Sequence, residues 1–90
     1  MATIKSTDET FDNIIKENKI VLTDFWASWC SPCLTLAPIL EELSDELKDK
    51  GVVIVKHNID EEPNLPVKFS VRGIPTMTLH VDSQHKDTKV

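Results

Sequence analysis

Hydrophobic and polar positions near the start of the chain follow the spacing of a helix. Phe11, Ile14 and Ile15 recur at i, i+3 and i+4, which places them on one face of a short helix. Just before them, Ser6-Thr7-Asp8-Glu9 has the Ser-x-x-Glu form of a capping box. In a capping box, two side chains satisfy free backbone amides at a helix start. We therefore predict a first helix that begins with these capping residues.

Continuous apolar runs further along the chain predict strands. Ile20–Ala27 and Val52–Val55 show little alternation, which is typical of strands buried on both faces of a central parallel sheet, and the second run continues through Ile59. Thr76–Val81 mostly alternates, so we expect an antiparallel strand or one nearer an edge. A final strand over Lys86–Val90 would make the sheet mixed.

A longer helix is predicted between the first two strands. Proline suits the first helical turn, so Ser31-Pro32 marks its start, and Gly51 supplies its stop. Pro38 should bend this helix because it removes one backbone hydrogen bond. The apolar stripe along the helix consists of Leu36, Leu40, Leu43 and Leu47. A short helix is allowed over Leu65–Phe69. A strand–helix–strand crossover implies a right-handed parallel pair, so the predicted fold class is α/β.

Composition limits the possible functions. Ninety residues, 40% hydrophobic and 28% charged, describe a single soluble domain over residues 1–90. The net charge of −5 and the lack of a basic cluster argue against nucleic acid as a partner. No run approaches the roughly 20 apolar residues of a membrane span, and the N-terminal residues lack the apolar run of a secretory signal. Two cysteines make no disulfide scaffold, so we expect a reducing cytoplasm.

The two cysteines form the motif Cys30-Ser31-Pro32-Cys33 between a predicted strand and a predicted helix. Free amides and the helix dipole at a helix start favour thiolate over thiol. The spacing brings the two sulfurs within bonding reach. We expect Cys30 to attack a substrate disulfide and Cys33 to resolve the mixed disulfide.

Two structural alternatives compete with redox chemistry at this motif. His80 and His85 complete a formal Cys2His2 zinc set, although the chain between Cys33 and His80 is far longer than in a compact zinc finger. A purely structural disulfide is the other alternative, disfavoured by the expected reducing compartment. Redox chemistry, with no bound metal or cofactor, remains the preferred interpretation.

Asp24 interrupts the first apolar run, where a charge is costly unless it is paired. One interpretation is an outward-facing residue on a half-exposed strand. The other is a buried carboxyl with a raised pKa, close enough to exchange a proton with Cys33 through water. Lys56 could pair with it across neighbouring strands, or end its own strand in solvent.

Residues around the turn before the third strand suggest a substrate surface. Pro75 is a candidate for a cis peptide bond, which would leave the Ile74 backbone free to pair with an extended substrate. Trp26 is assigned to the core and Trp29 to the surface near Cys30, with a core role for both as the alternative. His57 is expected to end a strand in solvent.

Several segments, in order along nearly the whole chain, resemble the thioredoxin family. The resemblance implies a central mixed sheet flanked by helices, and a general protein dithiol–disulfide oxidoreductase that carries electrons from thioredoxin reductase to disulfide-containing proteins. The segments are Val21–Ala27, Trp29–Cys33, Ala37–Leu40 and Arg72–Thr76.

The resemblance also implies residue roles. Cys30 matches the attacking thiol and Cys33 the resolving one, Asp24 the buried acid and Lys56 the lysine beside it. Pro75 matches the family's cis-proline. The residues implied to line the substrate groove are Trp29, Gly73 and Ile74, together with Ser31 and Pro32 between the cysteines.

The chain departs from the family pattern at three places. Ser31 replaces a typical glycine, which affects the redox potential, and Leu34 replaces a basic residue. Asp82-Ser83-Gln84 replaces a glycine-containing turn, and the sequence stops at Val90, before the family's last helix. We therefore expect one sheet face to be less covered, which favours self-association or lower stability. A redox-inactive module that binds partners on the same surface is the alternative function.

Overall fold

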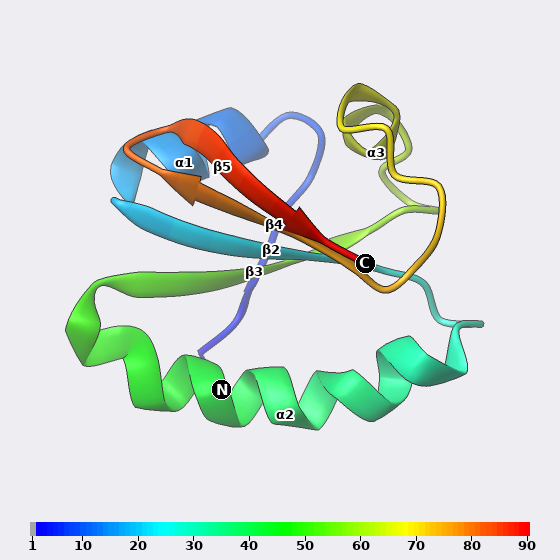
Figure 1. Ribbon diagram of the computed structural model, residues 1–90, viewed down its shortest axis with the longest axis horizontal. Helices are drawn as coiled ribbons and strands as arrows, with labels where there is room; N and C mark the ends of the chain where they lie inside the picture. Colours follow the sequence, from blue (N-terminus) through cyan, green and yellow to red (C-terminus); the bar gives the residue numbers. More distant parts are fainter. Residues whose placement is uncertain (1) are drawn as a thin grey trace.

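A five-stranded mixed sheet forms the centre of the protein (Figure 1). The computed structural model describes residues 2–90. The strand order is β1-β3-β2-β4-β5, with β1 and β2 parallel to β3, β4 antiparallel to β2, and β5 antiparallel to β4. The strand bounds are β1 Ile4–Lys5, β2 Ile20–Trp26, β3 Val52–Asn58, β4 Thr76–Val81 and β5 Gln84–Lys89. The predicted α/β class with a mixed sheet is confirmed.

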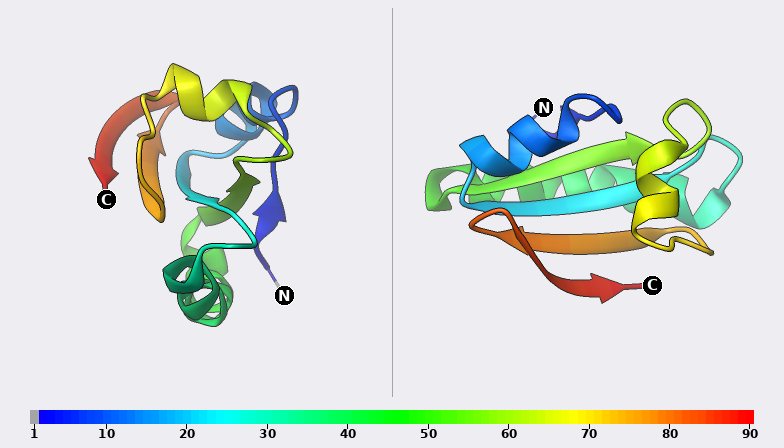
Figure 2. Two further views of the ribbon diagram at one scale, coloured as in Figure 1. Left: turned by 90° about the vertical axis from the view of Figure 1, so that its right-hand side faces the viewer. Right: turned by 90° about the horizontal axis from the view of Figure 1, so that it is seen from above.

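Helices cover the sheet from both sides (Figures 1 and 2). Helix α2 (Ser31–Leu47) packs against β3 on one face, and a 3-10 turn, Lys48–Lys50, continues it. Helices α1 (Phe11–Glu17) and α3 (Asn64–Lys68) lie on the other face. Within residues 2–90, none of these helices is long and apolar enough to cross a membrane.

The main apolar core lies between the sheet and helices α1 and α3. Phe11, Phe25 and Leu65 are buried at its centre. Phe69 packs edge-on against Phe11, and partly buried aliphatic residues close the cluster. This core ties α3 and the segment after it to the strands, so it supports the loops at the carboxyl ends of β2 and β3.

The opposite face is less completely buried. Strand residues alternate between the two faces, which places Leu22 with Asp24 and Trp26 on the α2 side. The apolar side chains that remain only partly buried there include Leu22, Met77, Leu79 and Val81. The prediction that β2 is buried on both faces is therefore only partly correct. Self-association through this surface stays a prediction.

The ends of α2 follow the sequence signals. Pro32 occupies the first turn and Pro38 lies inside the helix. Gly51 adopts φ +76° after the 3-10 turn, a left-handed conformation that glycine reaches without steric cost. The predicted apolar stripe is only partly buried, since Leu40 is the one leucine of the four with a fully buried side chain.

The start of α1 differs from the prediction. The helix begins at Phe11 with Thr10 as its N-cap residue, and the side chains of Thr7 and Thr10 accept each other's backbone amides. The predicted capping box from Ser6 to Glu9 is wrong, because Ser6 is fully buried and hydrogen-bonds to His57 instead. Strand β1, only two residues long, was also not predicted.

The turn between β4 and β5 has two residues. Asp82 and Ser83 both adopt positive φ, 52° and 67°, as a type I′ hairpin requires. The Ser83 hydroxyl donates to the carbonyl of Ile15, which ties the turn to α1. This two-residue turn brings β5 back antiparallel to β4, so the predicted final strand is present and starts two residues earlier than predicted, at Gln84.

Candidate functional site

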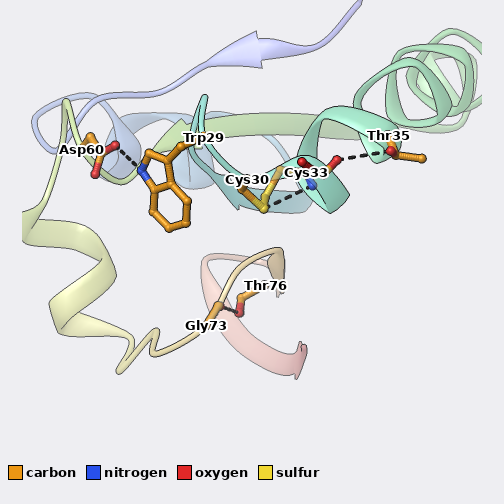
Figure 3. Close-up of a disulfide and its surroundings, with 8 residues drawn as sticks. Trp29, Cys30, Cys33, Thr35, Asp60, Gly73 and Thr76 are labelled. Atoms are coloured by element: carbon orange, nitrogen blue, oxygen red, sulfur yellow. Dashed lines mark hydrogen bonds between the residues drawn. A yellow bond between two sulfur atoms is a disulfide. The ribbon is translucent and has the colours of Figure 1, made fainter.

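Cys30 and Cys33 lie at the start of α2, directly after the loop that follows β2 (Figure 3). Their side chains form a disulfide, with the two Cα atoms 5.2 Å apart. Cys30 is the N-cap residue of α2, and its sulfur accepts the Cys33 backbone N–H at 3.2 Å. Cys30 is 5% exposed and Cys33 1% exposed. The helix start thus offers an amide hydrogen bond and a positive dipole end to the outer sulfur.

Asp24 is fully buried in β2, as one of the two interpretations predicted. Neither carboxyl oxygen has a hydrogen-bond partner among the described residues. Burial raises the pKa of Asp24 from 3.8 to about 6, against the opposing effect of the Lys56 charge. Asp24 and Lys56 face each other in the β2–β3 register, and the Lys56 ammonium lies 4.5 Å from the centre of the Trp26 ring. This carboxyl can therefore gain or lose a proton near neutral pH.

Trp29 and the segment around Gly73 flank the disulfide from two sides (Figure 3). Trp29 is 65% exposed, and its indole N–H donates to the Asp60 carboxylate at 2.7 Å. A pocket of about 280 Å³ lies between these segments. Its lining is mostly apolar and consists of Trp29, Ile59, Pro66, Val71, Arg72, Gly73 and Ile74. The pocket could accept an apolar side chain of a bound protein next to Cys30.

The predicted groove residues fall into two groups. Trp29, Gly73 and Ile74 line the pocket, whereas Ser31 and Pro32 are exposed on the first turn of α2 and are not part of its lining. Pro75 is half-buried, and its peptide bond with Ile74 is cis, as predicted.

Sequence reasoning missed Asp60 and the apolar residues from the β3–α3 region. Ile59 and Asp60 directly follow β3, whose carboxyl end lies beside that of β2. Ligand sites in open α/β sheets commonly lie outside these strand ends, which is the one signal that could have indicated this loop. Pro66 and Val71 carried no such signal.

The two histidines of the zinc alternative lie in another environment. His80 and His85 stack on each other with ring centres 5.3 Å apart, and both also pack edge-on against Phe69. Burial lowers the pKa of His80, and the His85 and Lys68 charges lower it further. Across residues 2–90, no cluster of three or more His, Cys, Asp or Glu side chains is arranged to hold a metal ion.

Comparison with known proteins identifies the family. A sequence profile described as Thioredoxin matches residues 2–90. The chain belongs to the thioredoxin family. It is 49% identical over 85 residues to a thioredoxin of Rickettsia bellii, covering 93% of this chain and 80% of that protein. It is 47% identical over 85 residues to a thioredoxin of Acidithiobacillus ferridurans, covering 93% of this chain and 78% of that protein.

A solved structure supports the same assignment. A mutant thioredoxin from Halobacterium salinarum NRC-1 superimposes with a TM-score of 0.91 at 31% identity, covering 99% of this chain and 77% of that one. With the Cys30–Cys33 pair in a C-x-x-C motif, this thioredoxin-family chain is a protein dithiol–disulfide oxidoreductase.

Proposed function

We propose that Cys30 is the attacking thiolate of this oxidoreductase and that Cys33 is its resolving thiol. The observation that carries the proposal is the Cys33 amide donating to the Cys30 sulfur at the start of α2. Once the disulfide is reduced, that hydrogen bond and the helix dipole stabilise negative charge on Cys30. Cys33, deeper and 1% exposed, is less accessible to a protein substrate.

The reaction proceeds in two exchanges. The Cys30 thiolate attacks one sulfur of a substrate disulfide, which forms a mixed disulfide and releases the other substrate sulfur as a thiolate. Cys33 then loses its proton and attacks the Cys30 sulfur, which closes the Cys30–Cys33 disulfide and releases the second substrate thiolate. Two electrons pass to the substrate, and the active site is left in the oxidised state that the structure contains.

Asp24 is proposed to accept the Cys33 proton through water. Its carboxyl lies on the α2 side of β2, has no competing hydrogen-bond partner among residues 2–90, and has a pKa of about 6. A base with this pKa accepts a proton readily near neutral pH. Lys56 opposes the rise in the Asp24 pKa and so keeps the acid partly ionised in the working range.

The pocket beside Cys30 is proposed to bind the polypeptide next to the substrate disulfide. Trp29, Gly73 and Ile74 line this pocket. Ser31 and Pro32 in the first turn of α2, and Pro75 directly after Ile74, are proposed to contact the same substrate segment. Thioredoxin reductase is the proposed electron donor, and the cytoplasm is the proposed compartment in which the chain serves electron transport. Family membership supports the first proposal, and the use of both cysteines in one redox motif supports the second.

The experiment is insulin reduction with dithiothreitol, comparing the unmodified chain with Cys30→Ser and Cys33→Ser. Cys30→Ser should abolish turnover. Cys33→Ser, reduced and then separated from dithiothreitol before insulin is added, should accumulate a mixed disulfide with insulin through the intact Cys30. Retained turnover in Cys30→Ser would refute the assignment. A stoichiometric complex that is insensitive to Cys30→Ser would favour a redox-inactive binding module.

A further inference from the structure

Four polar side chains form a hydrogen-bonded cluster, which we call the clasp, between the segment before α1 and the loop after β3: Ser6, Asp8, His57 and Glu62. Ser6 and His57 are both fully buried, contrary to the prediction that His57 ends its strand in solvent. Ser6 Oγ lies 2.8 Å from His57 Nδ1, and His57 Nε2 lies 2.9 Å from the Glu62 carbonyl oxygen and 3.3 Å from Asp8 Oδ1. Because both neighbours of Nε2 are acceptors, Nε2 donates to them, and the Ser6 hydroxyl is the hydrogen-bond partner of Nδ1.

The other half of the clasp ties the same two segments together. The Asp8 carboxylate accepts the backbone amides of Asn64 at 3.1 Å and Leu65 at 2.8 Å. In return, the Glu62 carboxylate accepts the Asp8 amide at 2.8 Å. The clasp residues Ser6, Asp8, His57 and Glu62 thus join the segment before α1 to the β3–α3 loop, residues 59–63. These hydrogen bonds together fix the conformation of the loop. Loss of any one of them leaves a polar group without a partner, which lowers the stability of this region.

The loop held by the clasp carries one wall of the pocket. Asn58 Oδ1 accepts the amides of Asp60 and Glu61, which fixes the beginning of the loop, while the clasp fixes its end. Asp60 in turn accepts the indole N–H of Trp29. Trp29 is mostly exposed, so this hydrogen bond is the polar contact that orients its ring beside Cys30 (Figure 3).

We propose that His57 is a positioning residue for substrate binding. By donating a hydrogen bond to the Glu62 carbonyl, His57 keeps the loop in the conformation in which the Asp60 carboxylate accepts the Trp29 indole N–H. In this way His57 sets the shape of the pocket. This inference rests on the proposed role of the pocket as the substrate site. The consequence is that loss of the clasp weakens binding of a protein disulfide more than it slows thiol exchange.

Three variants separate positioning from simple support of the fold. Ser6→Ala/His57→Leu removes both partners together, so neither is left as an unpaired buried polar group. We expect the KM for insulin to rise about fivefold, the factor equivalent to one net hydrogen bond, with kcat changed less than about twofold. His57→Gln retains a donor toward the Glu62 carbonyl and should restore most of the KM. His80→Leu, which removes a buried histidine outside the clasp, should leave the KM unchanged.

Two measurements report on the loop without any turnover. Hydrogen exchange of the Asp60, Asn64 and Leu65 amides should accelerate in the double variant but not in His80→Leu. In a Trp26→Phe background, fluorescence anisotropy of Trp29 should fall, since its ring loses a fixed partner. Asp60→Ala should raise the insulin KM as much as the double variant does, and the two changes combined should not add, because both act through the same indole.

The outcomes are decisive in each direction. Wild-type KM, exchange and anisotropy in the double variant would overturn the proposal, and so would faster exchange with an unchanged KM. If the double variant does not fold, Asp8→Ala, at a partly exposed position, releases the same loop and must show the same KM and exchange changes. If Cys30→Ser retains turnover, the proposed chemistry fails, whereas exchange and anisotropy still decide whether the clasp orients Trp29.

Discussion

Replacing Asp24 with asparagine should change how the stability of the protein depends on pH. Asp24 is fully buried and its carboxyl oxygens have no hydrogen-bond partner among residues 2–90. Burial raises its pKa, so ionisation is less favourable in the folded protein than in the unfolded chain. Asparagine has a similar shape and does not titrate, so the variant isolates the effect of the charge.

The sign and size of the effect follow from the pKa. An acid whose pKa rises on folding binds more protons in the native state, so the free energy of unfolding falls as the pH rises. The change from 3.8 to about 6 corresponds to roughly 3 kcal/mol, lost between about pH 4 and pH 7. The variant should lack this part of the decline.

The assay is urea unfolding of the oxidised protein, followed by circular dichroism at several pH values from 4 to 8. We expect the difference in unfolding free energy between Asp24→Asn and the unmodified chain to grow by roughly 3 kcal/mol across this range. Asp45→Asn, at an exposed position on α2, is the matched control and should follow the unmodified chain throughout. The Asp24 variant should also release reduced substrate more slowly from the mixed disulfide.

Parallel pH profiles for Asp24→Asn and the unmodified chain would refute the reasoning. That result would mean that the carboxyl ionises equally easily in the folded and unfolded states. A difference of equal size in the Asp45 control would instead trace the effect to net charge. If the pH dependence of stability changes but the rate of substrate release does not, the burial of Asp24 is supported and its proposed proton transfer with Cys33 is refuted.

Other predictions concern the aromatic cluster and the two glycines. Because burial, with His85 and Lys68 nearby, lowers the pKa of His80 below 6.5, the unfolded chain binds the extra proton. The free energy of unfolding, measured in urea, should fall as the pH drops below about 6.5, and His80→Phe should remove the part of this fall that His80 causes. An equal fall in the variant and in the unmodified chain would contradict this role of His80. Gly51→Ala should lower the free energy of unfolding, measured in urea, by about 1 kcal/mol because φ is +76°. The cost should be no larger, since an added Cβ meets no atom within 4 Å. Gly73→Ala, without positive φ, should leave the melting temperature unchanged while raising the insulin KM, and an unchanged KM would place Gly73 outside the substrate contact.

Much of the fold was predictable because its signals are local. The apolar runs over β2 and β3 and the alternation over β4 predict strands, and Pro32 and Gly51 mark the two ends of the α2 segment. The failures have a common physical cause. Ser6 has the form of a helix cap, but a buried partner from a distant strand competes for its hydroxyl, and no local pattern reports that partner.

The candidate site divides along the same line. The sequence by itself determined that Cys30 and Cys33 lie one helical turn apart after a strand, since helix geometry requires only their spacing and the proline between them. Only the tertiary structure decided that Asp60 holds Trp29, that His57 is buried, and that neither oxygen of Asp24 finds a partner within residues 2–90. Contacts between residues distant in sequence depend on how the chain packs, and burial sets the cost of each charge. For this reason the reacting thiols were readable from the chain, whereas the shape and electrostatics around them required the fold.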